Sequence, residues 1–71
     1  MKYYLLKLKV KFIFKHEYVK LILLRCNEED IDTEVNLSKQ MVIFETGTST
    51  VETLNLITLT EERYNVLSIY L

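Results

Sequence analysis

Residues 2–14 alternate between two kinds of side chain, and this alternation constrains the fold more than any other feature of the sequence. From residue 4 on, one face carries apolar or aromatic side chains, those of Tyr4, Leu6, Leu8, Val10, Phe12 and Phe14. The other face includes the lysines Lys7, Lys9, Lys11 and Lys15. A period of two over this length predicts a long β-strand with one buried face and one basic face in water. Because a strand needs a neighbour for its backbone hydrogen bonds, the pattern also predicts a sheet.

Residues 16–26 fit either a strand or a helix. As a helix, they place Glu17 in the first turn and Arg25 in the last, which suits the charges of helix ends. As a strand, they would pair with residues 2–14, although residues 15–17 lack the Gly, Asn, Asp or Pro that hairpin loops favour. We favour the strand, because an antiparallel neighbour is the nearest partner for the first strand. A helix over 16–26 stays open.

The middle of the chain predicts further strands. The acidic residues 27–34 are typical of a solvated loop, and one strand or a pair of short strands is expected to follow, at 35–37 and 41–44. Residues 45–50 contain the single glycine and predict a turn. The Thr-rich residues 51–60 would then pair back as a hairpin.

The last residues predict a short helix. Thr60 is suited to cap it, because Glu61 and Glu62 follow in the first turn, where the helix dipole favours acids. A final strand over 67–71 is the alternative. The expected fold is therefore α+β. It is a single domain over residues 1–71, with a small antiparallel sheet of three to five strands, a C-terminal helix and, in the open alternative, a second helix at 16–26.

Composition indicates that the chain does not bury all of its apolar surface by itself. Apolar side chains make up 49% of the 71 residues, and nearly all of them are large. A chain of this size buries only about 60% of the surface that its unfolded form exposes. The lone cysteine cannot form an intrachain disulfide, and one His with one Cys cannot build a zinc site. We therefore expect a homo-oligomer, a dimer, or a complex with a protein partner.

Several classes of function lack the residues that they need. One glycine cannot form a Gly-rich phosphate loop, and the acidic segment places Val35 and Met41 where a calcium loop needs Gly and Glu. His16 and Cys26 are the only pair for nucleophilic chemistry, and no local signature supports them. We therefore predict that the protein is not an enzyme and has no catalytic, cofactor-binding or metal-binding residue.

The sequence also bears on location. Its uncharged runs are far shorter than the roughly 20 residues of a membrane span. Lysines interrupt the N-terminal apolar region, and no signal-peptide cleavage pattern follows it. We expect a cytoplasmic protein that makes no membrane contact.

Charge divides the chain into two halves. The formal net charge of −1 combines about +6 over residues 1–26 with about −7 over residues 27–71. The lysine face could follow a phosphate backbone while tyrosines stack on bases. A nucleic-acid-binding module is therefore the alternative function, although such modules usually carry net positive charge.

A small non-enzymatic protein–protein interaction module is the function that we predict. Tyrosines near both ends of the chain are typical interface residues. The candidate interaction surface consists of Tyr3, Tyr4, Lys7, Lys9, Lys11, Tyr64 and Tyr70. The scarcity of Gly and Pro, and the excess of Lys over Arg, indicate an AT-rich genome. An inhibitor or accessory factor of a phage, virus or plasmid fits this combination.

Overall fold

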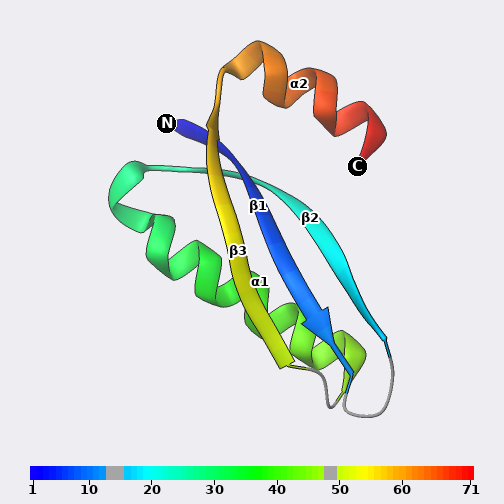
Figure 1. Ribbon diagram of the computed structural model, residues 1–71. Coiled ribbons are helices and arrows are strands. Elements are labelled where there is room, and N and C mark those ends of the chain that lie inside the picture. Colours follow the sequence, from blue (N-terminus) through cyan, green and yellow to red (C-terminus); the bar gives the residue numbers. More distant parts are fainter. Residues whose placement is uncertain (13–15, 48–49) are drawn as a thin grey trace.

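The computed structural model describes residues 1–12, 16–47 and 50–71 (Figure 1). Its elements are β1 (Lys2–Lys11), β2 (Glu17–Cys26), a 3-10 turn (Glu28–Asp30), α1 (Ile31–Thr46), β3 (Thr50–Leu59) and α2 (Glu61–Tyr70). An antiparallel sheet combined with one long helix and one short C-terminal helix confirms the expected α+β fold. Phe14 and Lys15, which the alternation assigned to the two faces of the first strand, lie outside the described residues.

β1 is the central strand of the sheet. The strand order is β2-β1-β3, and both outer strands run antiparallel to β1. β2 pairs with β1 in one unbroken register, from Lys2 opposite Cys26 to Lys11 opposite Glu17. The strand interpretation of residues 16–26 is therefore confirmed, and the helical alternative is wrong.

β3 occupies the other edge of β1. Its register is regular except for a shift between Lys7 and Leu8 of β1, where β3 contains an irregularity typical of a β-bulge. Residues 51–60 thus form a strand as predicted, but they do not pair back on the segment just before them. That segment is helical, so the hairpin prediction is wrong.

The helix α1 begins inside the loop predicted over 27–34, of which Glu28–Asp30 form the 3-10 turn, and it replaces the strands predicted at 35–37 and 41–44. It turns one stripe toward the sheet, with spacings of four, three and four residues: Ile31, Val35, Ser38 and Val42. Short apolar groups do not distinguish the two periods by themselves, which explains the strand prediction. Asp32 and Glu34 belong to the first turn of α1, where the helix dipole favours acids.

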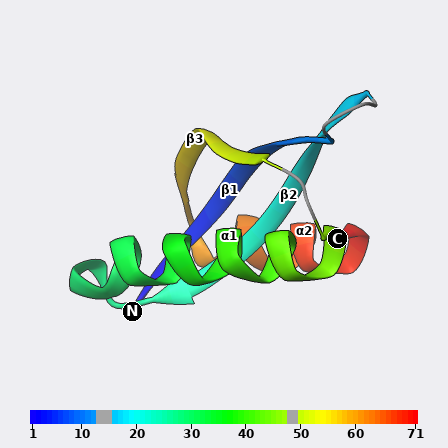
Figure 2. The same ribbon diagram turned by 90° about the horizontal axis from the view of Figure 1, so that it is seen from below.

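The core lies between α1 and one face of the sheet (Figure 2). Leu6, Leu8 and Val10 are completely buried, and Tyr4 is 6% exposed. Leu24 and Cys26 of β2 join them, and Val42 covers them from α1. The buried face of the first strand is therefore confirmed for these residues. The hydroxyl of Ser38, which is also buried, donates to the Glu34 carbonyl at 2.9 Å, so its polar group is satisfied.

The helix α2 lies at the end of the sheet where the chain begins (Figure 1). Thr60 has extended backbone angles, and its Oγ1 accepts a hydrogen bond from the Arg63 backbone N–H at 3.1 Å, so the predicted N-cap is confirmed. The alternative of a final strand over 67–71 is wrong. The ring of Tyr64 lies 5.0 Å from the ring of Tyr3, which projects from the sheet face opposite α1. The two helices therefore pack against opposite faces.

The folded chain is more extended than most domains of its size. Its radius of gyration is 12.7 Å, whereas a compact domain of this length has about 11 Å. It exposes 5269 Å² of surface, whereas a folded monomer of this mass exposes about 4,650 Å². One chain thus carries roughly 600 Å² more surface than it should as a compact monomer.

Candidate interaction surface

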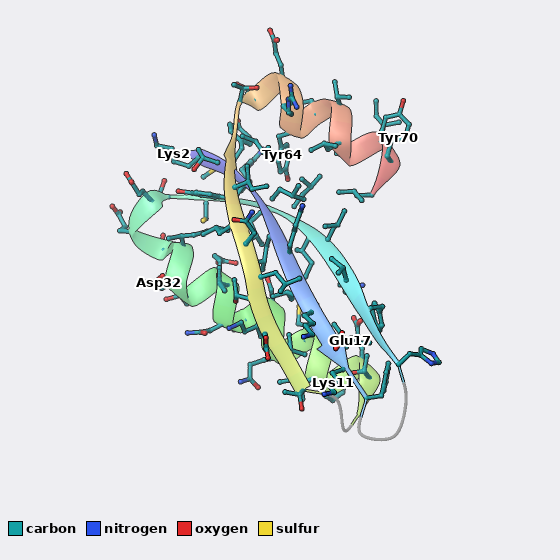
Figure 3. All side chains as sticks on the ribbon, viewed as in Figure 1. Lys2, Lys11, Glu17, Asp32, Tyr64 and Tyr70 are labelled. Atoms are coloured by element: carbon teal, nitrogen blue, oxygen red, sulfur yellow. The ribbon has the colours of Figure 1, made fainter. Side chains whose placement is uncertain are left out.

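The four tyrosines predicted as interface residues lie in different environments. Tyr4 points into the core, so it does not belong to the surface of this chain. Tyr3 and Tyr64 are half-buried against each other, and Figure 3 shows Tyr64 on the side of α2 that faces the sheet. Tyr70 lies near the outer end of α2 and is 79% exposed. Of the four, only Tyr70 presents most of its ring to solvent.

The three predicted lysines share one face of β1, as the alternation requires. Lys7 and Lys9 are half-buried, and Lys11 is exposed. The Lys9 ammonium lies 3.5 Å from a carboxylate oxygen of Glu17 on β2, and Glu52 of β3 is its register partner on the other side. The central lysine of this face is therefore bordered by acids on both neighbouring strands.

A second apolar stripe on α1 faces away from the sheet. Leu37, Met41 and Phe44 follow one another at spacings of four and three residues and are 53%, 63% and 89% exposed. The exposed residues between Thr33 and Phe44 carry no charge, since Asn36 and Gln40 complete this face. We call Leu37, Met41 and Phe44 the outer stripe. The outer stripe was not among the predicted site residues, because its helical spacing becomes evident only when residues 31–46 form a helix.

A small cavity adjoins the outer stripe between α1 and β2. It has a volume of about 220 Å³ and is lined by Lys20, Ile22, Ser38, Met41, Val42 and Glu45. Met41 belongs to both the stripe and the cavity. An apolar side chain that packs on the outer stripe could therefore also contact the face of β2 that α1 covers.

Cys26 and His16 do not form a catalytic pair. Cys26 ends β2 and is buried, whereas His16 immediately precedes β2 and is exposed. A strand of this length separates the two side chains by about 30 Å. Burial raises the pKa of the Cys26 thiol, and the nearby carboxylates of Glu34 and Asp30 raise it further. The thiol is therefore held in its unreactive protonated form.

The pKa of Tyr4 shifts in the same direction. Burial of its hydroxyl raises the pKa most, and the negative charges of Glu28 and of ionised Cys26 add to the effect. Both shifts result from groups placed in the core beside the acidic start of α1. They describe a neutral interior and do not mark a reactive site.

The described residues contain no group of three or more His, Cys, Asp or Glu side chains that could hold a metal ion. Among the same residues, no helix is long and apolar enough to cross a membrane. No protein-family model matches the sequence, and no curated protein or solved structure matches it. The surface of the chain itself is therefore the basis for a functional argument.

Proposed function

We propose that this chain is a protein–protein interaction module whose α1 helix presents the outer stripe to a partner protein. The exposure of Phe44, at 89%, is the single observation that carries the proposal. A large aromatic side chain that stays exposed to water adds little to the stability of the folded chain. Burying the same side chain at an interface contributes strongly to the free energy of binding. The sheet-facing stripe of α1 already supplies the packing that the fold needs, so the outer stripe serves another purpose.

The outer stripe fits one known mode of recognition. Helices that dock into a groove present anchors at positions i, i+4 and i+7, which are the positions of Leu37, Met41 and Phe44. Because no charge interrupts the stripe, the complementary surface is an apolar groove with few charged residues at its centre. The cavity beside Met41 would accept one apolar side chain of the partner.

Photo-crosslinking from position 44 tests this proposal. A photoreactive phenylalanine analogue at Phe44 should crosslink to one dominant protein in the native cell extract, and Phe44→Glu should abolish its binding. The matched control is Ile69→Glu on α2, which changes an equally exposed apolar residue, 77% exposed, on another helix. A partner bound equally well by the wild type and by Phe44→Glu would overturn the assignment of α1.

We propose self-association as a second property of the chain. The excess surface of roughly 600 Å² supports a homodimer, since two copies could bury it between them. We also propose that the protein acts in the cytoplasm as an inhibitor or accessory factor of a phage, virus or plasmid. The composition of the chain supports this origin, with seven Lys against two Arg, no Pro and one Gly.

Nucleic-acid binding by the lysine face is the alternative. Lys7 and Lys11 have no ion-pair partner among the described residues, which favours it, whereas the contact between Lys9 and Glu17 weakens it. Oligonucleotide binding measured against salt concentration decides the question. Affinity that falls steeply with salt and is lost in Lys7→Ala/Lys11→Ala would establish this function, and a flat response would exclude it.

A further inference from the structure

We infer that two copies of the chain pair edge to edge through β2, with Leu21 of one copy opposite Leu21 of the other. The product is one continuous antiparallel sheet of six strands. This inference rests on the self-association proposed above, and it specifies the surface and the register. It concerns the edge of the sheet, whereas the outer stripe belongs to α1.

The outer edge of β2 has the properties of a pairing surface. In the described part of the chain, β2 has a strand on one side only, because the order is β2-β1-β3 (Figure 1). All ten of its residues pair with β1 without a register shift, so the strand is free of bulges. It contains no proline, and its centre from Leu21 to Leu24 carries no charge. A long and regular edge with an uncharged segment of this kind is a template for another strand.

The pleat of the sheet limits how two β2 strands can meet. Residues directly opposite each other in an antiparallel pair lie on the same face of the sheet. If a two-fold axis perpendicular to the sheet relates the copies, odd-numbered residues of one β2 must lie opposite odd-numbered residues of the other. The possible centres of symmetry near the middle of β2 are then single residues: Lys20, Leu21 or Ile22.

Charge selects among these three centres. A centre at Leu21 places Glu17 opposite Arg25 of the second copy, and the two-fold axis repeats this pair. A centre at Lys20 would set the two lysines directly against each other. A centre at Ile22 would set Val19 against Arg25 and would leave Glu17 without a basic partner. Of these three registers, only the one centred on Leu21 places the acid at one end of β2 opposite the base at the other end of the second copy.

The same register joins the apolar residues. It places Val19 opposite Leu23 of the second copy and Tyr18 opposite Leu24, on the two faces of the sheet. Val19, Tyr18 and Leu21 are 55%, 39% and 38% exposed in the single chain. Arg25 is exposed and has no ion pair among the described residues, so its guanidinium is available to Glu17 of the other copy.

The area and the closure of the assembly agree with a dimer. A stable interface takes about 800 Å² from each partner, and the roughly 600 Å² of excess surface, which is spread over the whole chain, is of the same order. Because the contact uses the same edge on both copies, it closes at two chains. The remaining edges of the six-stranded sheet are the two β3 strands, whose irregularity beside Lys7 and Leu8 discourages further addition.

Charge reversal tests the register. Glu17→Arg and Arg25→Glu should each weaken the dimer about tenfold, because each variant faces two like-charge pairs. A mixture of the two variants should form a heterodimer, since both cross-strand pairs are then of opposite charge. Glu52→Arg on β3 and Arg63→Glu on α2 make the same charge changes at other exposed positions and should have no effect. Lys9→Met removes the contact of Glu17 within the chain and should also leave the dimer intact.

A cysteine placed at the axis gives an independent test. In a Cys26→Ala background, Leu21→Cys should form an intermolecular disulfide under mild oxidation, because residues directly opposite each other have Cβ atoms about 5 Å apart. Leu23→Cys should not, since its own counterpart is offset along the strand. A wild type that stays monomeric at high micromolar concentration in light scattering would overturn both self-association and this inference. A dimer that ignores the charge reversals and does not crosslink at position 21 would overturn the β2 register alone.

Discussion

Three residues of β1 hold the core together. Leu6, Leu8 and Val10 are fully buried, and they lie in the one strand that contacts both neighbouring strands. Few other side chains in the described part of the chain are as deeply buried, so each of them carries a large share of the stability. A domain of this size has only about 0.05–0.15 kcal/mol of stability per residue in total.

Leu8→Ala should therefore destabilise the protein severely. Truncating a fully buried leucine costs about 2–5 kcal/mol, because the chain loses the burial of the side chain and gains a cavity. Leu37→Ala is the matched control, since its side chain is 53% exposed, and it should cost under about 1 kcal/mol. Urea unfolding followed by circular dichroism measures both. Equal losses in the two variants would contradict the burial described for β1.

The buried thiol of Cys26 predicts a dependence of stability on alkaline pH. Its pKa is raised by burial first and by Glu34 and Asp30 second, above the ordinary value of 9.0. Above pH 9.0 the unfolded chain releases this proton while the folded chain still holds it. The free energy of unfolding therefore falls as pH rises through that window, and the contribution is fully present below it.

Cys26→Ala removes this contribution, together with the part of the Tyr4 pKa shift that ionised Cys26 causes. As pH rises above 9.0, the free energy of unfolding should fall more for the wild type than for Cys26→Ala. Parallel pH profiles would show that the thiol titrates alike in the folded and unfolded chains. In addition, thiol reagents should label Cys26 much more slowly in the native protein than in urea.

Among the elements, the three strands and α2 could be predicted from the sequence, and α1 could not. β1 shows a period of two over many residues, and α2 begins with a local cap at Thr60, so both signals are contained in the segments themselves. The stripes of α1 are interrupted by polar residues and include Ser38, which patterns of hydrophobicity do not mark as buried. Their helical spacing is meaningful only once the sheet supplies a surface for Ile31, Val35 and Val42.

The residues of the candidate site were likewise predictable only where the signal lies within one segment of the chain. Tyr70 is 79% exposed, so it can belong to an interaction surface, whereas Tyr4 is buried, as the alternation of β1 already indicated, and its place in the candidate surface was wrong. The outer stripe of α1 depended on a helix that the sequence did not predict. The pairing of β1 with β3 brings together residues far apart in the chain, and no local pattern encodes that choice.

The N-cap of α2 gives a prediction at the scale of one element. In Thr60→Ala, the Arg63 N–H loses its acceptor, which should cost about 1 kcal/mol of helix stability. None of the α2 residues is buried, so the loss should stay local to this helix. Hydrogen exchange should show faster exchange of α2 amides and unchanged β1 amides. Thr60→Ser keeps the acceptor and should behave as wild type. Uniformly faster exchange throughout the sheet would contradict a local role.

At the scale of the whole molecule, the fold interleaves the two charged halves of the chain. The basic strands β1 and β2 are adjacent in the sheet, while the 3-10 turn, α1, β3 and α2 carry nine of the ten acids. Glu52 of β3 lies opposite Lys9 in the register, and the Glu17 carboxylate of β2 lies 3.5 Å from the Lys9 ammonium. The division along the sequence is therefore partly neutralised in space, which leaves apolar surface as the main unsatisfied feature of the molecule.

Stability should consequently depend on protein concentration. If folding is completed by pairing with a second copy, mass action stabilises the native state as the concentration rises above the Kd. An increase of about 100-fold above the Kd should add about 2.7 kcal/mol and raise Tm by on the order of 10 °C. Calorimetry over that range measures the shift. Arg25→Glu should flatten the dependence, whereas Arg63→Glu should preserve it. A Tm that is constant for the wild type would mean that the single chain is stable with its excess surface exposed to water.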